Sequence, residues 1–371
     1  MKIIQNDNFN FREKINLLNF DRHQMRNFFC SIGEKSFCAD QIMIWIYHHF
    51  CCDFDKMTNL KKNLRKKLKK ISTIFAPKFI QEKVSIDGTI KWMVDLNNQN
   101  IETVYIPEKN RGTLCISSQS GCILNCQFCA TGHQGFNRNL LVSEIVGQIW
   151  RAYKKINILK KNIFHPITNI VIMGMGEPLL NFNNVITALR IMSDNLGFNI
   201  SKRKIVLSTS GIIPAIDKLS KIMDVKLAIS LHASNNTIRN KIMPINKKYN
   251  IESLLSAILR FLKKSKINKD GITIEYVMLK NINDTLYHAQ QLIKLLRYIP
   301  SKINLIPWNN FLNSNFTASD SNQIKKFANF LINKGFVTTI RKPRGQDIQA
   351  ACGQLNGNLS YSINKKKMFL K

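Results

Sequence analysis

Three cysteines lie within eight positions of one short stretch, GCILNCQFCATG, at residues 121–132. They are Cys122, Cys126 and Cys129, and the next cysteine along the chain is Cys352. A structural zinc site usually closes with four ligands, and an iron–sulfur electron carrier also uses four thiolates. Three thiolates on a four-iron cluster leave one iron open. An open coordination position is what a catalytic metal site needs in order to bind a small molecule.

A zinc site is the alternative for the same cysteines. His133 is the nearest residue that could supply a fourth ligand, and a set of three cysteines and one histidine can hold a structural zinc ion. A chain of that kind would be a non-catalytic RNA-binding protein. It would be colourless, whereas an iron–sulfur protein is brown.

Strands and helices alternate through most of the chain after about residue 100. Strands are expected at residues 169–173, 204–208, 225–231, 272–279, 303–307 and 336–340. This repetition predicts an α/β fold with a parallel sheet and helices on its faces. Working residues collect at the C-terminal ends of such strands. Because the motifs GMGEP, STSG, SLHAS and PWNN follow expected strands, we expect them to share one pocket with the cysteine stretch.

The motifs at these strand ends could bind a small polar ligand. The carbonyl of Gly176 and the carboxylate of Glu177 can meet an ammonium group, and glycine lets the backbone approach closely. Further partners for ribose, adenine and carboxylate groups would come from Ser208, Ser230, Leu231, His232 and Asn309. Each residue alone also has an ordinary reading, as part of a turn, a sheet end or a loop. Their joint order after the cysteine stretch indicates a binding site.

The N-terminal part of the chain has a different pattern. Short amphipathic helices with many basic residues are expected from about residue 9 to 70, and β-rich runs follow at 78–85, 89–96, 101–107 and 113–118. The whole chain of 371 residues has 55 Lys and Arg against 23 Asp and Glu, a net charge of +32. This balance predicts a polyanionic partner such as RNA, although compositional drift toward lysine is an alternative.

The sequence contains no signal for a membrane or for secretion. No apolar run reaches the roughly 18 residues that span a bilayer, and the N-terminus lacks a secretory signal. We therefore expect a cytoplasmic protein without a membrane partner.

The cysteine stretch, with Phe128 before its last cysteine, resembles the motif of the radical S-adenosylmethionine superfamily. Together with GMGEPLLN, STSG, AISLHA, NLIPWN and RGQDIQAACGQL it resembles the RlmN/Cfr family of RNA methyltransferases over nearly the whole chain. The resemblance implies an α/β fold, a partial (β/α)6 barrel with a small N-terminal helical accessory domain and a β-extension. The implied boundaries are 1–78 for an RNA-binding accessory domain, 79–107 for the β-extension, 108–350 for the core and 351–371 for a C-terminal segment.

The resemblance also implies a role for individual residues. Cys122, Cys126 and Cys129 would ligate one [4Fe-4S] cluster, whose open iron binds S-adenosylmethionine. The S-adenosylmethionine contacts would be Gly176, Glu177, Ser208, Ser230, Leu231, His232 and Asn309. Cys352 would carry the methyl group, Cys115 would resolve the product through a disulfide, and Glu102 would accept a proton.

The implied reaction methylates carbon 2 of an adenine in 23S rRNA and of the adenine 3′ of the anticodon in some tRNAs. It would consume two S-adenosylmethionine molecules per turnover, one as methyl donor and one as radical source, and would pass through S-methylated Cys352. An electron donor such as flavodoxin would supply electrons, and the protein would be a monomer. Two enzymatic alternatives are a Cfr-like methylation of adenine C8 and a radical enzyme acting on a protein. The second would leave the charge of +32 unexplained.

Overall fold

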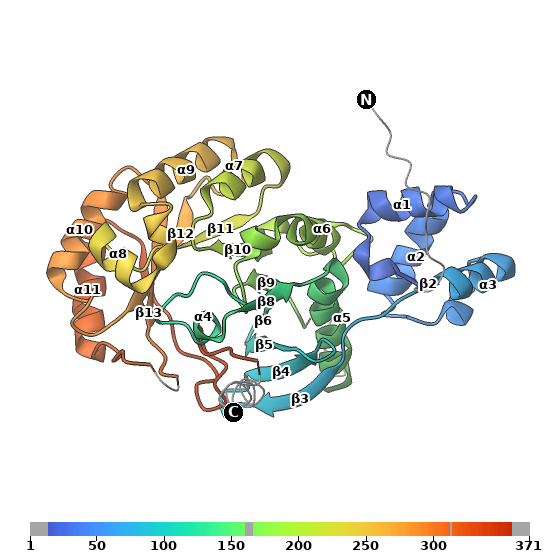
Figure 1. Ribbon diagram of the computed structural model, residues 1–371, viewed down its shortest axis with the longest axis horizontal. Helices are drawn as coiled ribbons and strands as arrows, with labels where there is room; N and C mark the ends of the chain where they lie inside the picture. The colour runs from blue at the N-terminus through green and yellow to red at the C-terminus, as the bar shows by residue number, and fades with distance from the viewer. Residues whose placement is uncertain (1–13, 160–165, 312–313, 358–371) are drawn as a thin grey trace, which may run out of the picture.

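The computed structural model describes residues 14–159, 166–311 and 314–357. Its main feature is one ten-stranded sheet in the order β14-β13-β12-β11-β10-β9-β6-β5-β4-β3 (Figure 1). Neighbouring strands are parallel from β14 to β6 and antiparallel from β6 to β3. Because the order ends on β14 and β3 without a pairing between them, the barrel is open, as expected for a partial barrel.

The parallel part of the sheet carries the strand ends that form the site. Its strands are β6 (Arg111–Cys115), β9 (Asn169–Ile172), β10 (Ile205–Thr209), β11 (Lys226–Ser230), β12 (Ile272–Met278), β13 (Ser301–Pro307) and β14 (Thr338–Ile340). The expected strands are all present, and the last one is shorter than the run 336–340. Residues such as Ile205, Leu207 and Ile229 are fully buried, since helices cover the sheet.

Helices surround the parallel strands (Figure 1). They are α5 (Val142–Leu159), α6 (Phe182–Ser193), α7 (Ile213–Ile222), α8 (Asn236–Ile242), α9 (Ile251–Lys264), α10 (Leu286–Leu296) and α11 (Ser321–Asn333). α9 illustrates why they form: Asn250 caps its N-terminus by accepting the Ser253 amide, and Leu254, Ile258 and Phe261 lie on one buried face.

The antiparallel part of the sheet is the β-extension, formed by β3 (Phe79–Val84), β4 (Ile90–Asp95) and β5 (Asn100–Glu108). The turn between β3 and β4 contains Asp87 and Gly88, where Gly88 has φ +80° and the Asp87 carboxylate accepts the Thr89 amide. Such an Asp-Gly turn favours a hairpin. The extension is therefore joined edge to edge to the barrel through β5 and β6.

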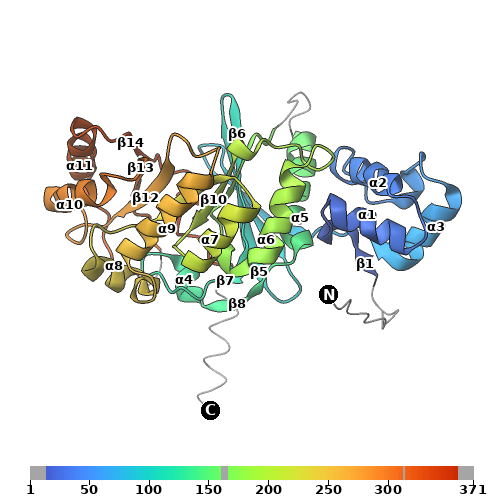
Figure 2. The same cartoon turned by 90° about the horizontal axis from the view of Figure 1, so that it is seen from above.

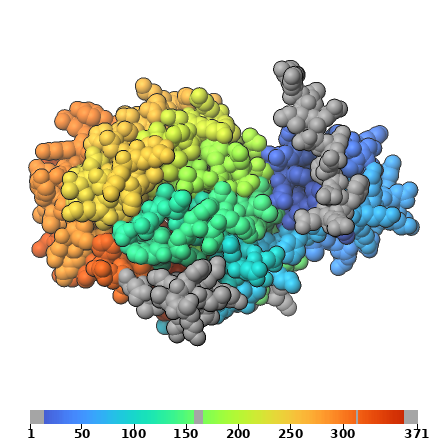
Figure 3. Space-filling view, in the orientation of Figure 1, coloured from blue at the N-terminus to red at the C-terminus, as the bar shows by residue number. Residues whose placement is uncertain are grey.

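The N-terminal module contains α1 (Arg22–Ser31), α2 (Phe37–Tyr47) and α3 (Lys62–Ile71), and a short parallel pair, β1 (Ile15–Asn16) with β2 (Ser72–Thr73). It lies beside α5 and α6 at one end of the molecule (Figures 2 and 3). The Trp150 indole on α5 donates to the Ile46 carbonyl on α2 at 2.9 Å, and Arg190 on α6 pairs with Asp21 at 3.1 Å. The helical character expected for this region is confirmed.

Two expectations reach beyond the described residues. Residues 1–13 of the implied accessory domain and 358–371 of the implied C-terminal segment lie outside them. The four domain boundaries stay a prediction. Among the described residues no helix is long and apolar enough to cross a membrane.

Candidate active site

The three-cysteine stretch forms a loop between two short strands. β7 (Gln119–Gly121) pairs antiparallel with β8 (Phe136–Asn139), and α4 (Ala130–Gln134) begins directly after Cys129. This small hairpin was not expected from the sequence. Gly121 is required at its base, because a Cβ there would lie 1.8 Å from the Gly135 carbonyl. The hairpin fixes both ends of the cysteine loop.

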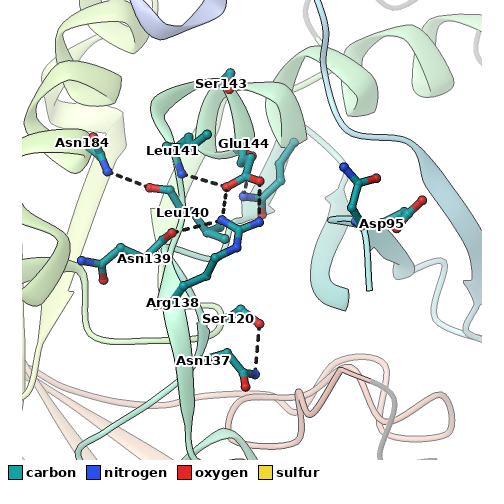
Figure 4. A network of polar contacts seen from close by, with 12 residues as sticks. Asp95, Ser120, Asn137, Arg138, Asn139, Leu140, Leu141, Ser143, Glu144 and Asn184 are labelled. Carbon is teal, nitrogen blue, oxygen red and sulfur yellow. Dashed lines mark hydrogen bonds and ion pairs between the residues drawn. The ribbon is translucent and has the colours of Figure 1, made fainter. Parts of the chain in front are cut away.

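A network of polar contacts holds this hairpin against α5 (Figure 4). The Arg138 guanidinium makes two 2.7 Å contacts with the Glu144 carboxylate, and the same carboxylate accepts the Leu141 amide at 2.8 Å. Nearby, Asn137 donates to the Ser120 hydroxyl. Bidentate arginine–carboxylate pairs are geometrically specific, so the orientation of the hairpin is fixed.

The geometry of the cysteine loop fits a cluster. Cys122, Cys126 and Cys129 are half-buried and line one cavity of about 120 Å³. Burial, together with the charges of Cys129 and Glu177, raises the pKa of Cys122 to about 12. Bound iron would reverse this effect by stabilising the thiolates, so the loading of a cluster would release protons. Nowhere in the described ranges do three or more His, Cys, Asp or Glu side chains converge on a single-ion position.

The fourth ligand of the zinc alternative is engaged elsewhere. Nε2 of His133 lies 2.9 Å from the Gln127 carbonyl, to which it must donate, and the ring packs edge-on against Phe311. Gly132, next to it, has no room for a side chain because a Cβ would lie 2.8 Å from the Cys126 carbonyl. The loop is thus closely packed around the three thiols.

A cavity of about 150 Å³, here called the strand-end cavity, lies beside the cysteine loop. Cys129 lines both this cavity and the one that contains all three thiols. The sequence-predicted residues that line it are Gly176, Glu177, Ser208, Ser230, His232, Asn309 and Cys352. Leu231 does not line it: the residue is fully buried, and its backbone bonds to Glu275 and Arg239.

Glu177 connects two of the strand-end motifs. One carboxylate oxygen accepts the Leu179 amide at 3.0 Å, and the other accepts the Ser210 amide at 2.7 Å. Burial raises the pKa of Glu177, and these hydrogen bonds oppose the rise. Gly176 has φ +94°, and a Cβ there would lie 2.4 Å from the Gln119 Cβ. The GMGEP turn is therefore built around glycine and a structurally engaged carboxylate.

His232 presents a neutral imidazole to the strand-end cavity. Its Nδ1 accepts the Val277 amide at 3.0 Å, and its backbone has φ +56°. Burial, with a smaller contribution from Arg239, lowers the pKa of His232 to about 3. Since Nδ1 accepts, the proton of the neutral ring is on Nε2, which can donate to a ligand oxygen.

Asn309 lines the same cavity but also holds the loop of residues 341–357, here called the Cys352 loop. Its Nδ2 donates to the Cys352 carbonyl at 3.1 Å, and its Oδ1 accepts from Gln346 at 2.8 Å. The Cys352 loop is also tied to the cysteine loop, because the Ala130 amide donates to the Gly353 carbonyl at 2.7 Å. Cys352, which the resemblance implies as the methyl carrier, therefore lies beside the cysteine loop.

A second cavity, of about 90 Å³, adjoins the strand-end cavity and shares part of its lining, including Cys129, Arg341 and Cys352. Cys115 at the end of β6 lines it, together with the basic side chains of Arg341, Lys342 and Arg344. Burial, and then the charge of Cys352, raises the pKa of Cys115 to about 12. Both thiols are free, and the disulfide between them stays a prediction.

Arg341 faces both cavities. The charge of Cys352 is the largest cause that raises the pKa of Arg341, and burial opposes it. The guanidinium therefore provides a fixed positive charge next to the thiol.

Glu102 lies on β5 and lines neither the strand-end cavity nor the second cavity. Its carboxylate pairs with Lys91 at 2.8 Å and accepts the Asn356 amide at 2.9 Å. The side chain is 3% exposed. Through the Asn356 amide, Glu102 therefore contacts the Cys352 loop.

Three further residues were not singled out from the sequence. Oε1 of Gln119 accepts the Glu177 amide at 2.8 Å, and the fully buried Arg239 donates to the Ser210, Ser230 and Leu231 carbonyls. Glu275 lines the strand-end cavity, and Asn304 donates to its carboxylate at 2.7 Å. A buried strand glutamate is the one sequence signal among them, since a carboxylate inside a sheet needs a partner.

Comparisons with known proteins agree with this geometry. A family model for the ribosomal RNA large subunit methyltransferase N-terminal domain matches residues 15–74, and the model of the radical SAM superfamily matches residues 116–293. The dual-specificity RNA methyltransferase RlmN of Buchnera aphidicola subsp. Baizongia pistaciae is 61% identical over 344 residues, which are 93% of this chain and 92% of that protein. Its counterpart from the subspecies Acyrthosiphon pisum is 59% identical, over 95% of this chain and 96% of that protein.

A solved structure supports the same assignment. The crystal structure of a radical SAM methyltransferase from Sphaerobacter thermophilus superimposes with a TM-score of 0.85 at 36% identity, over 92% of this chain and 99% of that chain. The chain therefore belongs to the RlmN family of RNA methyltransferases within the radical S-adenosylmethionine superfamily, and its cofactors are a [4Fe-4S] cluster and S-adenosylmethionine.

Proposed function

We propose that this enzyme methylates carbon 2 of a specific adenine in 23S rRNA, and of the adenine 3′ of the anticodon in a subset of tRNAs, with Cys352 as methyl carrier. One observation supports this proposal above the others. Cys352 lines both the strand-end cavity and the adjoining second cavity, and Cys129 and Arg341 line both as well. Only the second cavity also contains Cys115, Lys342 and Arg344. A group carried on its sulfur can therefore be received in the first cavity and presented to a base in the second.

Cys122, Cys126 and Cys129 hold the cluster, and the strand-end cavity receives S-adenosylmethionine. When bound, these cofactors supply a methyl group and a carbon-centred radical. Backbone at Gly176 and side chains at Ser208, Ser230 and His232 orient the ligand. Two of the proposed contacts, Glu177 and Asn309, also hold neighbouring backbone, so they fix the shape of the cavity as well.

The methyl carrier is needed because of the chemistry of the base. Carbon 2 of adenine lies between two electron-withdrawing nitrogens and is not nucleophilic, so it cannot take an electrophilic methyl group directly. Cys352 can, since a thiolate is a good nucleophile and Arg341 provides positive charge beside it. The target adenine must leave its stack to reach the second cavity, as in other base-modifying enzymes.

Cys115 resolves the product. After the S-bound carbon has joined adenine, the Cys115 sulfur attacks the Cys352 sulfur and forms a disulfide. The carbon–sulfur bond breaks with its electron pair on the adenine side, where a proton completes the methyl group. The two cysteines lie close enough for the charge of one to raise the pKa of the other.

Glu102 accepts the proton that leaves carbon 2. To reach the adenine its carboxylate must become accessible from the second cavity, because it is buried behind the Cys352 loop contact at Asn356 and lines neither cavity. This requirement makes the proton transfer dependent on movement of the Cys352 loop.

Basic side chains on the surface hold the RNA. The exposed lysines of α3 in the N-terminal module and the side chains of Lys342 and Arg344 beside the second cavity can contact phosphates. The net charge of +32 favours such contacts. We further propose that the enzyme acts as a monomer in the cytoplasm and that an electron donor such as a flavodoxin reduces it.

Mass spectrometry of RNA after reaction tests the proposed product. The holoenzyme is incubated with 23S rRNA and with tRNA, and the modified nucleoside is compared with authentic 2-methyladenosine and 8-methyladenosine. The proposal expects 2-methyladenosine in both RNAs. Formation of 8-methyladenosine would assign the enzyme to the Cfr-like reaction, and unmodified RNA in the presence of reductant and S-adenosylmethionine would refute the proposed function.

A further inference from the structure

A buried ion pair lies in the β-extension, outside both cavities. Lys91 on β4 and Glu102 on β5 are joined Nζ to Oε1 at 2.8 Å, and their side chains are 8% and 3% exposed. A buried pair of this kind adds little net stability compared with apolar residues of the same volume, because two charges have lost their water. Its position relative to other groups is therefore the more informative property.

Each member of the pair also contacts the Cys352 loop. Nζ of Lys91 donates to the Gln349 carbonyl at 3.0 Å, and the free oxygen of Glu102, Oε2, accepts the Asn356 amide at 2.9 Å. These two backbone groups lie on either side of Cys352 in the sequence. The pair thus connects the loop at two points that flank the thiol.

Three further hydrogen bonds join the same loop to the turn between β3 and β4. The Asp87 carboxylate accepts the Gly345 amide at 3.0 Å. In the opposite sense, the Asp347 carboxylate accepts the Ser85 hydroxyl at 2.6 Å and the Ile86 amide at 3.1 Å. The early part of the loop is therefore anchored on the extension independently of the ion pair.

These contacts are all between groups that are distant in sequence, and all of them join the loop to the β-extension. Hydrogen bonds to ionised groups are about twice as strong as neutral ones, and those at Lys91 and Glu102 are shielded from water. Loss of the pair would leave the backbone on either side of the thiol without these partners.

We propose that the Lys91–Glu102 ion pair holds the Cys352 loop so that the Cys352 sulfur faces the strand-end cavity, which makes Lys91 a positioning residue for the methyl-accepting thiol. This inference rests on the proposed role of Cys352 as methyl carrier. It gives Glu102 a function before any proton transfer, since the carboxylate that would accept the proton also holds the loop during methyl transfer.

The step that depends on this position is a displacement. The Cys352 thiolate attacks the methyl carbon of S-adenosylmethionine, and the new sulfur–carbon bond forms as the old sulfonium–carbon bond breaks. The electron pair of the broken bond stays on the departing S-adenosylhomocysteine, and the thiol proton has gone to water. Because the sulfur, the carbon and the leaving group must be aligned, a displacement of about 1 Å costs on the order of a hundredfold in rate.

The test compares three variants in the cluster-loaded full-length protein. Lys91→Met removes the cation but leaves a buried carboxylate, whereas Lys91→Met/Glu102→Leu removes both charges and avoids that penalty. Lys83→Met is the matched control, because Lys83 is the exposed cross-strand neighbour of Lys91 on β3. All proteins are measured at a temperature where iron content and circular dichroism show that they are folded.

Two properties are measured. The first is hydrogen exchange of the peptide containing Asn356, which does not depend on catalysis. The second is the initial rate of methyl transfer to Cys352, followed by mass spectrometry without RNA. We expect about tenfold faster exchange at Asn356 in the double variant, as loss of one good hydrogen bond produces, and at least about tenfold slower methylation of Cys352 in both Lys91 variants. Lys83→Met should match the wild type in both.

The result that overturns the proposal is a double variant with exchange and Cys352 methylation within twofold of the wild type. The proposal also fails if the double variant methylates Cys352 normally and loses only RNA methylation, because Glu102 would then act only as the base. Should the variants not fold, wild-type exchange decides: protection of the Asn356 amide supports the proposal, and exchange at the rate of an exposed amide overturns it. If the wild type does not methylate Cys352 at all, it is the proposed function that fails, whereas the exchange result still reports on the ion pair.

Discussion

The strand-end cavity and the Cys352 loop lie side by side but are built in different ways. Around the cavity, groups from neighbouring strands hold one another, as Glu177 after β9 holds the Ser210 amide after β10. The Cys352 loop is bonded to Asn309 after β13 and to Ala130 after the cysteine loop. It is also bonded to Lys91 and Glu102 of the β-extension, which are 258 and 254 residues from their loop partners. The proposed binding site for the cofactors is thus part of the barrel, whereas the loop of the proposed methyl carrier depends on the β-extension as well.

The two regions should therefore fail in different ways. A change in the barrel region should remove cofactor binding and every later step. A change in the loop region should leave cofactor binding intact and stop transfer alone.

Cys126→Ala should have the largest effect. Two thiolates cannot replace three around a four-iron cluster, so the variant should be colourless, with iron reduced from about four per chain to nearly none and with no activity. Iron analysis and the visible spectrum of anaerobically purified protein measure this. Cys30→Ala, at an exposed cysteine of α1, is the matched control and should keep its iron. A brown, iron-loaded Cys126→Ala protein would contradict the assigned ligand set.

Gly176→Ala tests how tightly the barrel region is packed. The residue has φ +94°, and its Cβ would lie 2.4 Å from the Gln119 Cβ. We therefore expect the free energy of unfolding to fall by about 2–4 kcal/mol and S-adenosylmethionine binding to weaken. Gly335→Ala is the control, because Gly335 has φ +86° but no atom within 4 Å of a Cβ. The free energy of unfolding of this variant should fall by only about 1 kcal/mol. Equal melting temperatures of the two variants would show that close packing at Gly176 has no effect.

His232→Asn tests the neutral imidazole in the cavity. The native pKa is about 3, against about 6.5 in the unfolded chain. Only the unfolded chain gains this proton between those values, so the stability that His232 contributes is present above pH 6.5 and falls as the pH decreases. Asparagine tolerates the positive φ of this position.

Melting temperatures at pH 7.5 and 5.5 measure this effect. The difference in melting temperature between the wild type and His232→Asn should change in favour of the variant when the pH is lowered from 7.5 to 5.5. The change should be equivalent to about 1.4 kcal/mol of unfolding free energy. A gap that is unchanged, or that widens in favour of the wild type at pH 5.5, would mean that His232 is protonated in the folded protein.

Replacement of Lys62, Lys66 and Lys70 by Gln should have the smallest effect. These exposed lysines recur every four residues on α3, far from both regions of the site (Figure 1). We expect RNA binding to weaken, and the slope of log binding constant against log salt concentration to fall in magnitude by up to about 3. Reductive cleavage of S-adenosylmethionine should be unchanged. The matched control replaces Lys325, Lys326 and Lys334 near α11 at the other end of the molecule. Identical slopes for the two triple variants would mean that the lysines of α3 make no phosphate contacts and reflect compositional drift alone.

The contrast between the two regions also explains what could be predicted from sequence. The strand-end residues follow from strand order, because parallel strands bring motifs such as GMGEP and STSG to one edge. The open barrel, the helices and the β-extension followed from periodicity and from the family resemblance. Leu231 is the exception, since its motif lies at the cavity but its side chain is buried in the core.

Tertiary contacts explain what the sequence did not reveal. Lys91 lies in the unremarkable strand run TIKWMVDL, and only the pairing of β4 with β5 brings it to Glu102. Arg239 lies in a short helix without any motif, yet its guanidinium joins three strand-end carbonyls. Asn309 was expected at the ligand, and the structure adds its bonds to the Cys352 loop. Such contacts depend on the folded positions of distant segments, so local patterns do not reveal them.

The most direct test of the account is the fate of RNA in a Cys115→Ala variant with its cluster loaded. If Cys352 carries the methyl group and Cys115 releases the product, the variant should accumulate a covalent protein–RNA adduct. A denaturing gel should show it as a shifted, S-adenosylmethionine-dependent band, and mass spectrometry should locate a Cys352–CH2–adenine thioether at carbon 2. The band should be absent from the Cys115→Ala/Cys352→Ala double variant. Normal release of methylated RNA from Cys115→Ala would contradict the account.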